Sequence, residues 1–173
     1  ITDYSQILKD EVALSKEEMN IVDLKLIVKS VVDDFNSIYE TKRGIKIEFE
    51  DKGNLKEYKI YGIENRIEQI IANLLDNSIS FSSDNKKISV QINKDNNKNI
   101  ILKVIDEGQG FKEKDTNKIF KRFYSNRPEK FGEHSGLGLN IVKNLVDLHG
   151  GSIKASNNLN QKGANIEIIF PKS

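Results

Sequence analysis

The sequence predicts an α/β protein, a two-layer sandwich in which three helices lie on one face of a mixed sheet of about five strands, with a further helix at the N-terminus. Three observations lead to this fold class. Several segments repeat apolar residues every three or four positions, as amphipathic helices do, whereas others alternate apolar and polar residues, as half-buried strands do. The two kinds of segment follow one another along the chain. Its 173 residues suffice for one domain with a substantial core.

The first two helices are predicted from apolar spacing and from end signals. Residues 3–19 carry apolar residues among charges and predict an amphipathic helix. A second helix begins near Asp23, whose carboxylate suits an N-cap, and runs to about Lys42. Gly44 follows and supplies the backbone conformation with which helices commonly end.

The remaining elements are strands and two more helices. Residues 64–81 have the clearest helical periodicity, and a last helix runs from Gly136 to His149, before Gly150 and Gly151. Strands are predicted at residues 45–50, 58–62, 87–93, 100–106, 152–156 and 164–170. The strands on either side of the polar stretch KDNNKN predict a hairpin.

Composition excludes several classes of function. The net charge of +1 argues against binding nucleic acid through a basic face. The absence of cysteine excludes disulfides, thiol catalysis and thiolate metal sites, and two histidines are too few for a histidine-rich metal site. No run of residues is long and apolar enough to predict a membrane segment. Because the chain starts at Ile1, we expect it to be a fragment of a longer protein.

A polar stripe marks the predicted helix at residues 64–81. Gln69, Asn73 and Asn77 are spaced four residues apart and therefore lie on one side of the helix, beside its apolar face. Neutral amides suit the wall of a phosphate site, because their oxygens can bind Mg²⁺ and their nitrogens can donate to phosphate. Amides at this spacing also fit a simple border with solvent, and this helix alone favours that interpretation.

Two glycine motifs flank a charged segment of about two dozen residues, a length of loop that usually serves a ligand. In the first motif, DEGQG, Asp106 ends a predicted strand and can accept a hydrogen bond from an amine such as that of adenine, while Gly108 and Gly110 allow close backbone approach. Taken alone, this motif favours an ordinary strand-to-loop turn.

The second motif, beginning at Ser135, leads into the last helix and can present free N–H groups to an anion. A hinge or an N-cap is the alternative. The polar stripe and both glycine motifs, in this order, rarely coincide by chance.

Together these motifs resemble the ATP-binding catalytic domain of sensor histidine kinases, which has the Bergerat fold of the gyrase–Hsp90–histidine kinase–MutL superfamily. EQIIANLLDNSISFS is similar to the N box, DEGQG to the G1 box, IFKRFY to the F box and SGLGLNIVKNLVDLHGG to the G2 box. Residues 23–173 would form this domain, and residues 1–22 look like the end of the second dimerization helix and a linker. Three stretches of sequence are most similar to ChvG/ExoS-type kinases, namely DNSISFS, FYSNRP and FGEHSGLGL.

The resemblance implies ATP and Mg²⁺ as ligands and assigns roles by motif. Asn73 would coordinate Mg²⁺, Asn77 would contact the phosphates, and Phe81 would line the base pocket. Asp106 would bind the adenine amine, with the backbone of Gly108 and Gly110 near the base. Arg122 of the F box would meet the γ-phosphate. The triphosphate would lie against the G2 loop, namely Ser135, Gly136, Leu137 and Gly138, and residues from about 107 to 135 would form the ATP lid.

Three positions depart from the family pattern. Gln69 stands where some relatives have a carboxylate, so it would orient the reactants but cannot act as a general base. Ser80 replaces a common Lys or Arg, and a phosphate contact there would be missing or supplied by another residue. His134 replaces the first glycine of the G2 pattern.

The resemblance implies transfer of the γ-phosphoryl group of ATP to a histidine on a dimerization domain absent from this sequence, followed by relay to a response regulator. The partners would be that domain, in a homodimer of the full-length protein, and the regulator. The location would be the cytoplasmic side of an inner-membrane sensor. Two alternatives remain open: an ATPase clamp of the gyrase or Hsp90 kind, which needs a water-activating Glu, and a nucleotide-binding switch without transfer activity.

Overall fold

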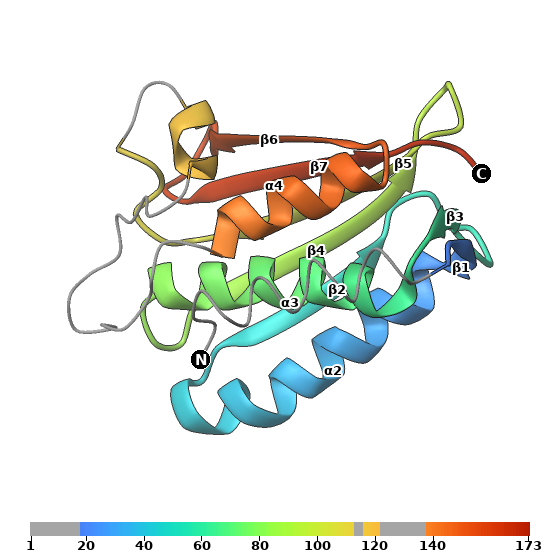
Figure 1. The fold of residues 1–173 in the computed structure, drawn as a ribbon. Helices are drawn as coiled ribbons and strands as arrows, with labels where there is room; N and C mark the ends of the chain where they lie inside the picture. Colours follow the sequence, from blue (N-terminus) through green and yellow to red (C-terminus); the bar gives the residue numbers. More distant parts are fainter. Residues whose placement is uncertain (1–17, 113–115, 122–137) are drawn as a thin grey trace, which may run out of the picture.

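A computed structural model describes residues 18–112, 116–121 and 138–173 of the chain. It shows the predicted two-layer sandwich: α2 (Leu24–Arg43), α3 (Glu64–Phe81) and α4 (Gly138–Leu148) lie side by side on one face of a five-stranded sheet (Figure 1). The predicted bounds of α3 are confirmed. Of the helix predicted at residues 3–19, residues 3–17 lie outside the described residues, and residues 18 and 19 are not helical.

The sheet is mixed, as predicted. Its strand order is β2-β4-β5-β7-β6, with β2 parallel to β4 and every other neighbouring pair antiparallel. The strands are β2 (Lys46–Asp51), β4 (Lys87–Lys94), β5 (Ile100–Asp106), β6 (Ser152–Asn157) and β7 (Ala164–Phe170). β5 is therefore the central strand, and its last residue is Asp106.

Two short elements were not predicted, and one predicted strand lies outside the main sheet. β1 (Asn20–Asp23) pairs antiparallel with β3 (Lys59–Gly62), and the two form a separate two-stranded sheet. A 3-10 helix, η1 (Thr116–Phe120), lies within the segment predicted as the lid. Four residues of β1 are too few to show an alternating pattern, and no partner was predicted for the strand at residues 58–62. The five-stranded sheet therefore excludes the strand at residues 58–62.

The core lies between the sheet and the helices. In β5, Ile100, Leu102 and Val104 are buried at alternate positions and face the helices. Asp106 continues this alternation, so its side chain points into the same layer and is only 2% exposed. The buried stripe of α3 packs from the other side; it consists of Ile67, Ile70, Ile71, Leu74 and Leu75.

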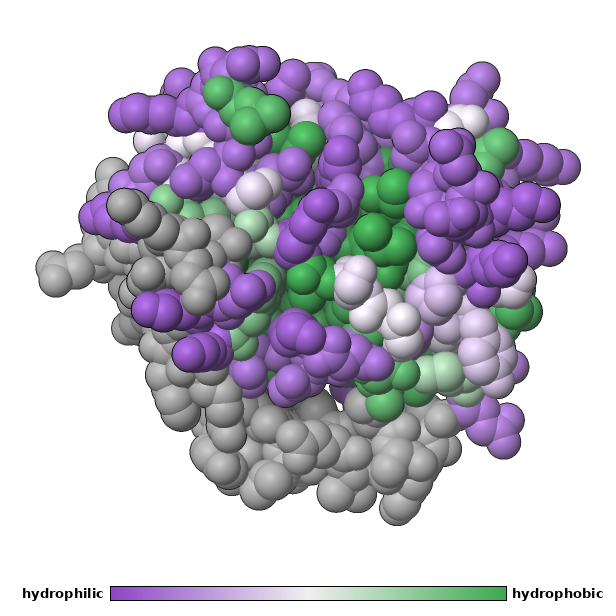
Figure 2. Space-filling model, turned by 90° about the horizontal axis from the view of Figure 1, so that it is seen from above, coloured by the Kyte–Doolittle hydropathy of each residue, from purple (hydrophilic) through white to green (hydrophobic). Residues whose placement is uncertain are grey.

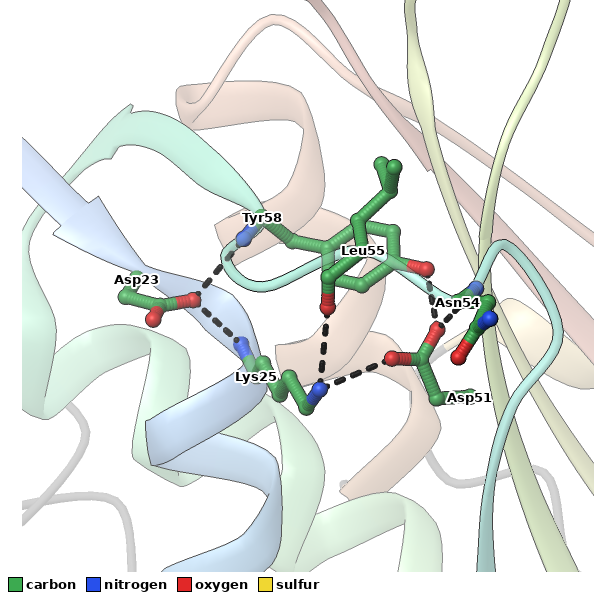
Figure 3. Close-up of polar contacts among 6 residues, drawn as sticks. All are labelled: Asp23, Lys25, Asp51, Asn54, Leu55 and Tyr58. Atoms are coloured by element: carbon green, nitrogen blue, oxygen red, sulfur yellow. Dashed lines mark hydrogen bonds and ion pairs between the residues drawn. The ribbon is translucent and has the colours of Figure 1, made fainter.

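A polar cluster ties the start of α2 to the loop between β2 and β3 (Figure 3). Lys25 donates from Nζ to Asp51 (2.8 Å) and to the Leu55 carbonyl (3.0 Å). The hydroxyl of Tyr58 donates to Asp51, while the carboxylate of Asp23 accepts from the backbone N–H groups of Lys25 and Tyr58, at 3.0 Å each. Asp23 is thus the N-cap that the sequence predicts.

The titration of this cluster follows from its contacts. Burial opposes ionisation of Asp51, but hydrogen bonds from Lys25, Tyr58 and Asn54 outweigh it and lower the pKa of Asp51. Burial and the bond to Asp51 raise the pKa of Tyr58 to about 12. At neutral pH the cluster therefore combines a charged carboxylate with a neutral phenol, which is the pairing that these hydrogen bonds require.

Most of the face drawn in Figure 2 is hydrophilic, in line with the 31% of charged residues, but an apolar area lies near its middle. Among the described residues, large apolar side chains remain exposed at Ile21, Leu26, Ile38, Tyr61, Leu148 and Leu159. Ile21 and Tyr61 are cross-strand partners in the small sheet. No described helix is both long and apolar enough to cross a membrane.

Candidate functional site

The site is built around the carboxylate of Asp106, at the end of the central strand. Its Oδ1 accepts hydrogen bonds from the backbone N–H groups of Gly108 (2.9 Å) and Ala164 (3.1 Å). The side chain of Ser78 on α3 also bonds to it. Three elements therefore fix the direction of this carboxylate: its own turn, the start of β7 and the helix that carries the polar stripe.

The electrostatic state of Asp106 favours a ligand that donates a hydrogen bond. Burial raises the pKa of Asp106, and the bonds from Gly108, Ala164 and Ser78 offset this only in part. A donor from a ligand stabilises the charged form of a carboxylate. A purine amine placed here would therefore be bound more strongly than by an exposed aspartate.

The polar stripe of α3 becomes more buried toward Asp106. Gln69 and Asn73 are partly exposed, whereas Asn77 is 3% exposed and directly precedes Ser78. Because a helix rises 1.5 Å per residue, Asn73 and Gln69 lie about 6 Å and about 12 Å from Asn77 along the axis. The stripe therefore runs along α3 away from the Asp106 carboxylate. The phosphates of a nucleotide whose base lay at Asp106 would extend in this direction.

Gln69 is held by its own helix. The amide Oε1 accepts a hydrogen bond from Arg66 Nη1 at 3.1 Å, and Arg66 is itself 9% exposed. An amide fixed in this way has a set orientation but accepts no proton at neutral pH. This contact supports an orienting role for Gln69 and gives no support to a general base at this position.

Glycine is required at both positions of the DEGQG motif. A Cβ on Gly108 would lie 2.6 Å from the carbonyl oxygen of Phe81, the last residue of α3. Gly110 has φ of +78°, and its Cβ would lie 2.6 Å from Oδ1 of Asn157. The backbone here is already in close contact with Phe81 on one side and with the turn between β6 and β7 on the other.

The end of α3 that carries Asn77 is capped by an arginine from α2. Arg43 donates from Nη1 to the carbonyl of Ile79 (3.0 Å) and from Nη2 to that of Ser82 (2.6 Å). Its Nε bonds to Asp84 at 2.7 Å. A cation at this end matches the negative end of the helix dipole. Arg43 was not identified from the sequence, because 36 residues separate it from Ile79.

The structure describes only part of the segments predicted to bind the phosphates. Arg122, Ser135, Gly136 and Leu137 lie outside the described residues, as do His134 and most of the predicted lid. Gly138 is the first described residue of α4, and a Cβ there would meet open space. Asn140 of α4 donates to the carbonyl of Phe120 in η1 at 3.1 Å, so the start of this helix is tied to the F box.

The remaining polar residues singled out in the sequence have contacts within the fold. The Ser80 hydroxyl donates to the carbonyl of Asn77 at 2.7 Å. His149 is 5% exposed, with Nε2 accepting from the N–H of Ile63 (3.1 Å) and Nδ1 beside the carbonyl of Leu145 (2.7 Å). The described part of the chain contains no group of three His, Asp or Glu residues able to hold a metal.

Comparison with known proteins places this arrangement in context. Residues 62–173 match the family described as histidine kinase-, DNA gyrase B-, and HSP90-like ATPase. The sensor protein ChvG of Agrobacterium fabrum is 32% identical over 169 residues, covering 94% of this chain and 28% of that protein. The signal transduction histidine-protein kinase ArlS of Staphylococcus aureus is 30% identical over 171 residues, covering 95% of this chain and 37% of that protein.

Solved structures show the same fold. The catalytic domain of histidine kinase ThkA superposes with a TM-score of 0.77 at 26% identity, covering 90% of this chain and 97% of that one. ThkA in complex with the response regulator protein TrrA gives a TM-score of 0.75 at 24% identity, covering 98% of this chain and 47% of that one. The chain therefore spans nearly all of a solved catalytic domain but less than two fifths of ChvG and ArlS.

Proposed function

Because the chain belongs to the histidine kinase-, DNA gyrase B- and HSP90-like ATPase family, we propose that it is the ATP-binding catalytic domain of a sensor histidine kinase. The observation that carries the proposal is the buried Asp106 carboxylate at the end of β5, with the amide stripe of α3 beginning beside it. The names of ChvG and ArlS favour a sensor kinase over other ATPases of the family.

In this function the adenine end is bound by Asp106. Its carboxylate accepts a hydrogen bond from the exocyclic amine, because Oδ1 is already held by two backbone N–H groups and burial favours a further donor. The backbone at Gly108 and Gly110 lies near the base. Phe81 covers it from the end of α3.

The phosphates extend along α3 toward the start of α4. Asn77 donates to them, and Asn73 offers an amide oxygen to Mg²⁺, a ligand type that suits this ion. Mg²⁺ supplies neutralisation of phosphate charge when it is bound. Backbone N–H groups of Ser135, Gly136, Leu137 and Gly138 bind the triphosphate at a helix N-terminus.

Transfer of the γ-phosphoryl group depends on how the reactants are positioned more than on acid–base chemistry, as in other phosphoryl transfers. Gln69 orients the reactants and Arg122 meets the γ-phosphate. The acceptor is a histidine on the dimerization domain of the full-length homodimer, and residues 1–22 lead from that domain to the catalytic domain at residues 23–173. The phosphoryl group then passes to a response regulator. The domain lies on the cytoplasmic side of an inner-membrane sensor.

Calorimetric titration with Mg²⁺ present tests the nucleotide site. The wild-type chain is expected to bind ATP at least tenfold more tightly than inosine triphosphate (ITP), since inosine carries an oxygen in place of the amine and this oxygen would face the Asp106 carboxylate. Equal affinity for the two nucleotides would refute the assignment of Asp106. Failure to bind either would refute the ATP-binding function.

A further inference from the structure

The turn that joins β6 to β7 contacts the nucleotide site from the side opposite α3. The turn, residues 157–163, is closed by a bond from the N–H of Asn158 to the carbonyl of Gly163 at 2.9 Å. β6 is the edge strand of the sheet and β7 pairs with β5, so this turn lies beside the end of β5. It approaches the DEGQG motif although about fifty residues separate the two in sequence.

Asn157 holds the far end of the motif by two bonds. Its Oδ1 accepts from the N–H of Phe111 at 2.6 Å, and its Nδ2 donates to the carbonyl of the same residue at 3.1 Å. A side-chain amide that bonds both the N–H and the carbonyl of one residue satisfies the backbone groups that a neighbouring strand would otherwise bond. Phe111 is the residue after Gly110, and the predicted lid continues from it.

Asn158 holds the near end. Its Nδ2 donates to the backbone carbonyl of Asp106 at 2.9 Å. Gly163 is also in close contact there, since its φ is +128° and a Cβ on it would lie 2.0 Å from the same carbonyl oxygen. The N–H of Ala164, the next residue, donates to the Asp106 carboxylate.

The segment from Asp106 to Phe111 is therefore fixed between two supports. On one side the carbonyl of Phe81 lies against Gly108, and on the other Asn157 and Asn158 bond its two ends. The α3 support also carries the predicted phosphate ligands, but the turn carries none. Loosening the turn should thus disturb the base contacts and leave the phosphate contacts in place.

We propose that Asn157 and Asn158 are positioning residues that determine selectivity for the adenine base. This inference rests on the proposed adenine site at Asp106. Asn158 holds the backbone of Asp106 and so sets the direction of its carboxylate. Asn157 holds the backbone of Phe111 and so sets the position of the preceding residue, Gly110. A site whose donors and acceptors are held in place discriminates between bases more sharply than one that must order on binding.

The test compares ATP with ITP in matched variants of this chain. Asn157→Ala and Asn158→Ala each remove bonds to the main chain of the motif. Each is expected to lower the ratio of ATP to ITP affinity by about threefold to tenfold, mainly through weaker ATP binding. Asn160→Ala, at an exposed position of the same turn, is the control and should keep the wild-type ratio.

Thermal unfolding without nucleotide is measured for each variant, to confirm that it is folded at the titration temperature. If Asn157→Ala does not fold, Asn157→Ser replaces it, because its side chain is shorter and has one polar atom in place of the two amide atoms that bond Phe111. A folded variant with the wild-type ratio overturns the inference. Equal losses for ATP and ITP overturn it too, since they indicate a general structural role. Failure of the proposed function is seen separately in the wild-type chain: binding of neither nucleotide refutes ATP binding, and equal affinity for both refutes the adenine site at Asp106.

Discussion

We expect Asp106→Asn to weaken binding of adenine nucleotides without destabilising the protein. Asparagine has the same shape, and its amide oxygen can accept from the N–H groups of Gly108 and Ala164 as Oδ1 does. What is lost is a charge-assisted hydrogen bond to the adenine amine, worth about 1.5–3 kcal/mol. Affinity for ATP should therefore fall roughly tenfold to a hundredfold.

The stability of the variant follows from the titration of Asp106. Burial raises its pKa, so the folded protein favours the protonated form. A carboxyl group of this kind stabilises the folded state below its unfolded pKa, and the contribution is lost as pH rises through the folded pKa. At pH 7 the ionised group carries a cost that asparagine does not, so Asp106→Asn should unfold at the same temperature or higher. The difference should shrink as pH falls.

Calorimetric titration and thermal unfolding at pH 7 and at lower pH measure both effects. Glu107→Gln is the matched control, because it neutralises the adjacent carboxylate, which bonds to the N–H of Lys87 at 2.9 Å. Its affinity for ATP should stay close to that of the wild type. Unchanged affinity in Asp106→Asn would remove this residue from the site, and lower affinity with a large loss of stability would assign it a structural role.

Three further contacts are tested by substitution. Asn73→Ala should abolish most of the gain in ATP affinity on adding Mg²⁺, measured by titration with and without the ion; an unchanged gain contradicts the assignment. Arg43→Met should lower the free energy of unfolding in urea by about 2 kcal/mol, because the last turn of α3 loses its cap, whereas Asp84→Ala, at an exposed partner, should change it by less than about 0.5 kcal/mol. Tyr58→Phe should cost about 1–2 kcal/mol at pH 7 by removing the bond to Asp51. Since the pKa of Tyr58 is raised from 10.0 to about 12, the advantage of the wild type should decline over that range, and an advantage that persists above it would contradict the contact.

The elements predicted correctly are those whose signal is local. The apolar stripe of α3 repeats over 18 residues, and the N-cap at Asp23 and the C-cap at Gly44 depend on neighbours a few positions away. Gly44 has φ of +65° and donates to the carbonyl of Glu40, as its position at the end of a helix predicts. The place of Asp106 at the end of its strand was predicted for the same reason, since strand, carboxylate and glycines are contiguous.

The residues that were missed act through tertiary contacts. Arg43 caps a helix that begins 21 positions later in the chain, and Asn157 meets Phe111 only because β7 pairs with β5. Ala164 contributes a backbone N–H, which every residue except proline has, so its identity carries no signal. β1 was missed because its four residues show no alternating pattern, and it forms by pairing with β3. Which loops meet at the end of the central strand is decided by the packed sheet.

In the proposed function this chain donates the γ-phosphoryl group of ATP to a histidine outside it. This transfer is tested by incubating the chain with γ-labelled ATP and Mg²⁺, alone and with a separate fragment that bears the dimerization helices and the acceptor histidine of the same protein. We expect label on the fragment only, stable to base and labile to acid, and reduced by Arg122→Ala. A donor site without its tethered acceptor loses positioning worth about 7–11 kcal/mol, so transfer should be slow. Robust label on the chain itself, at His134 or His149, would contradict the claim, as would ATP binding without any transfer to the fragment.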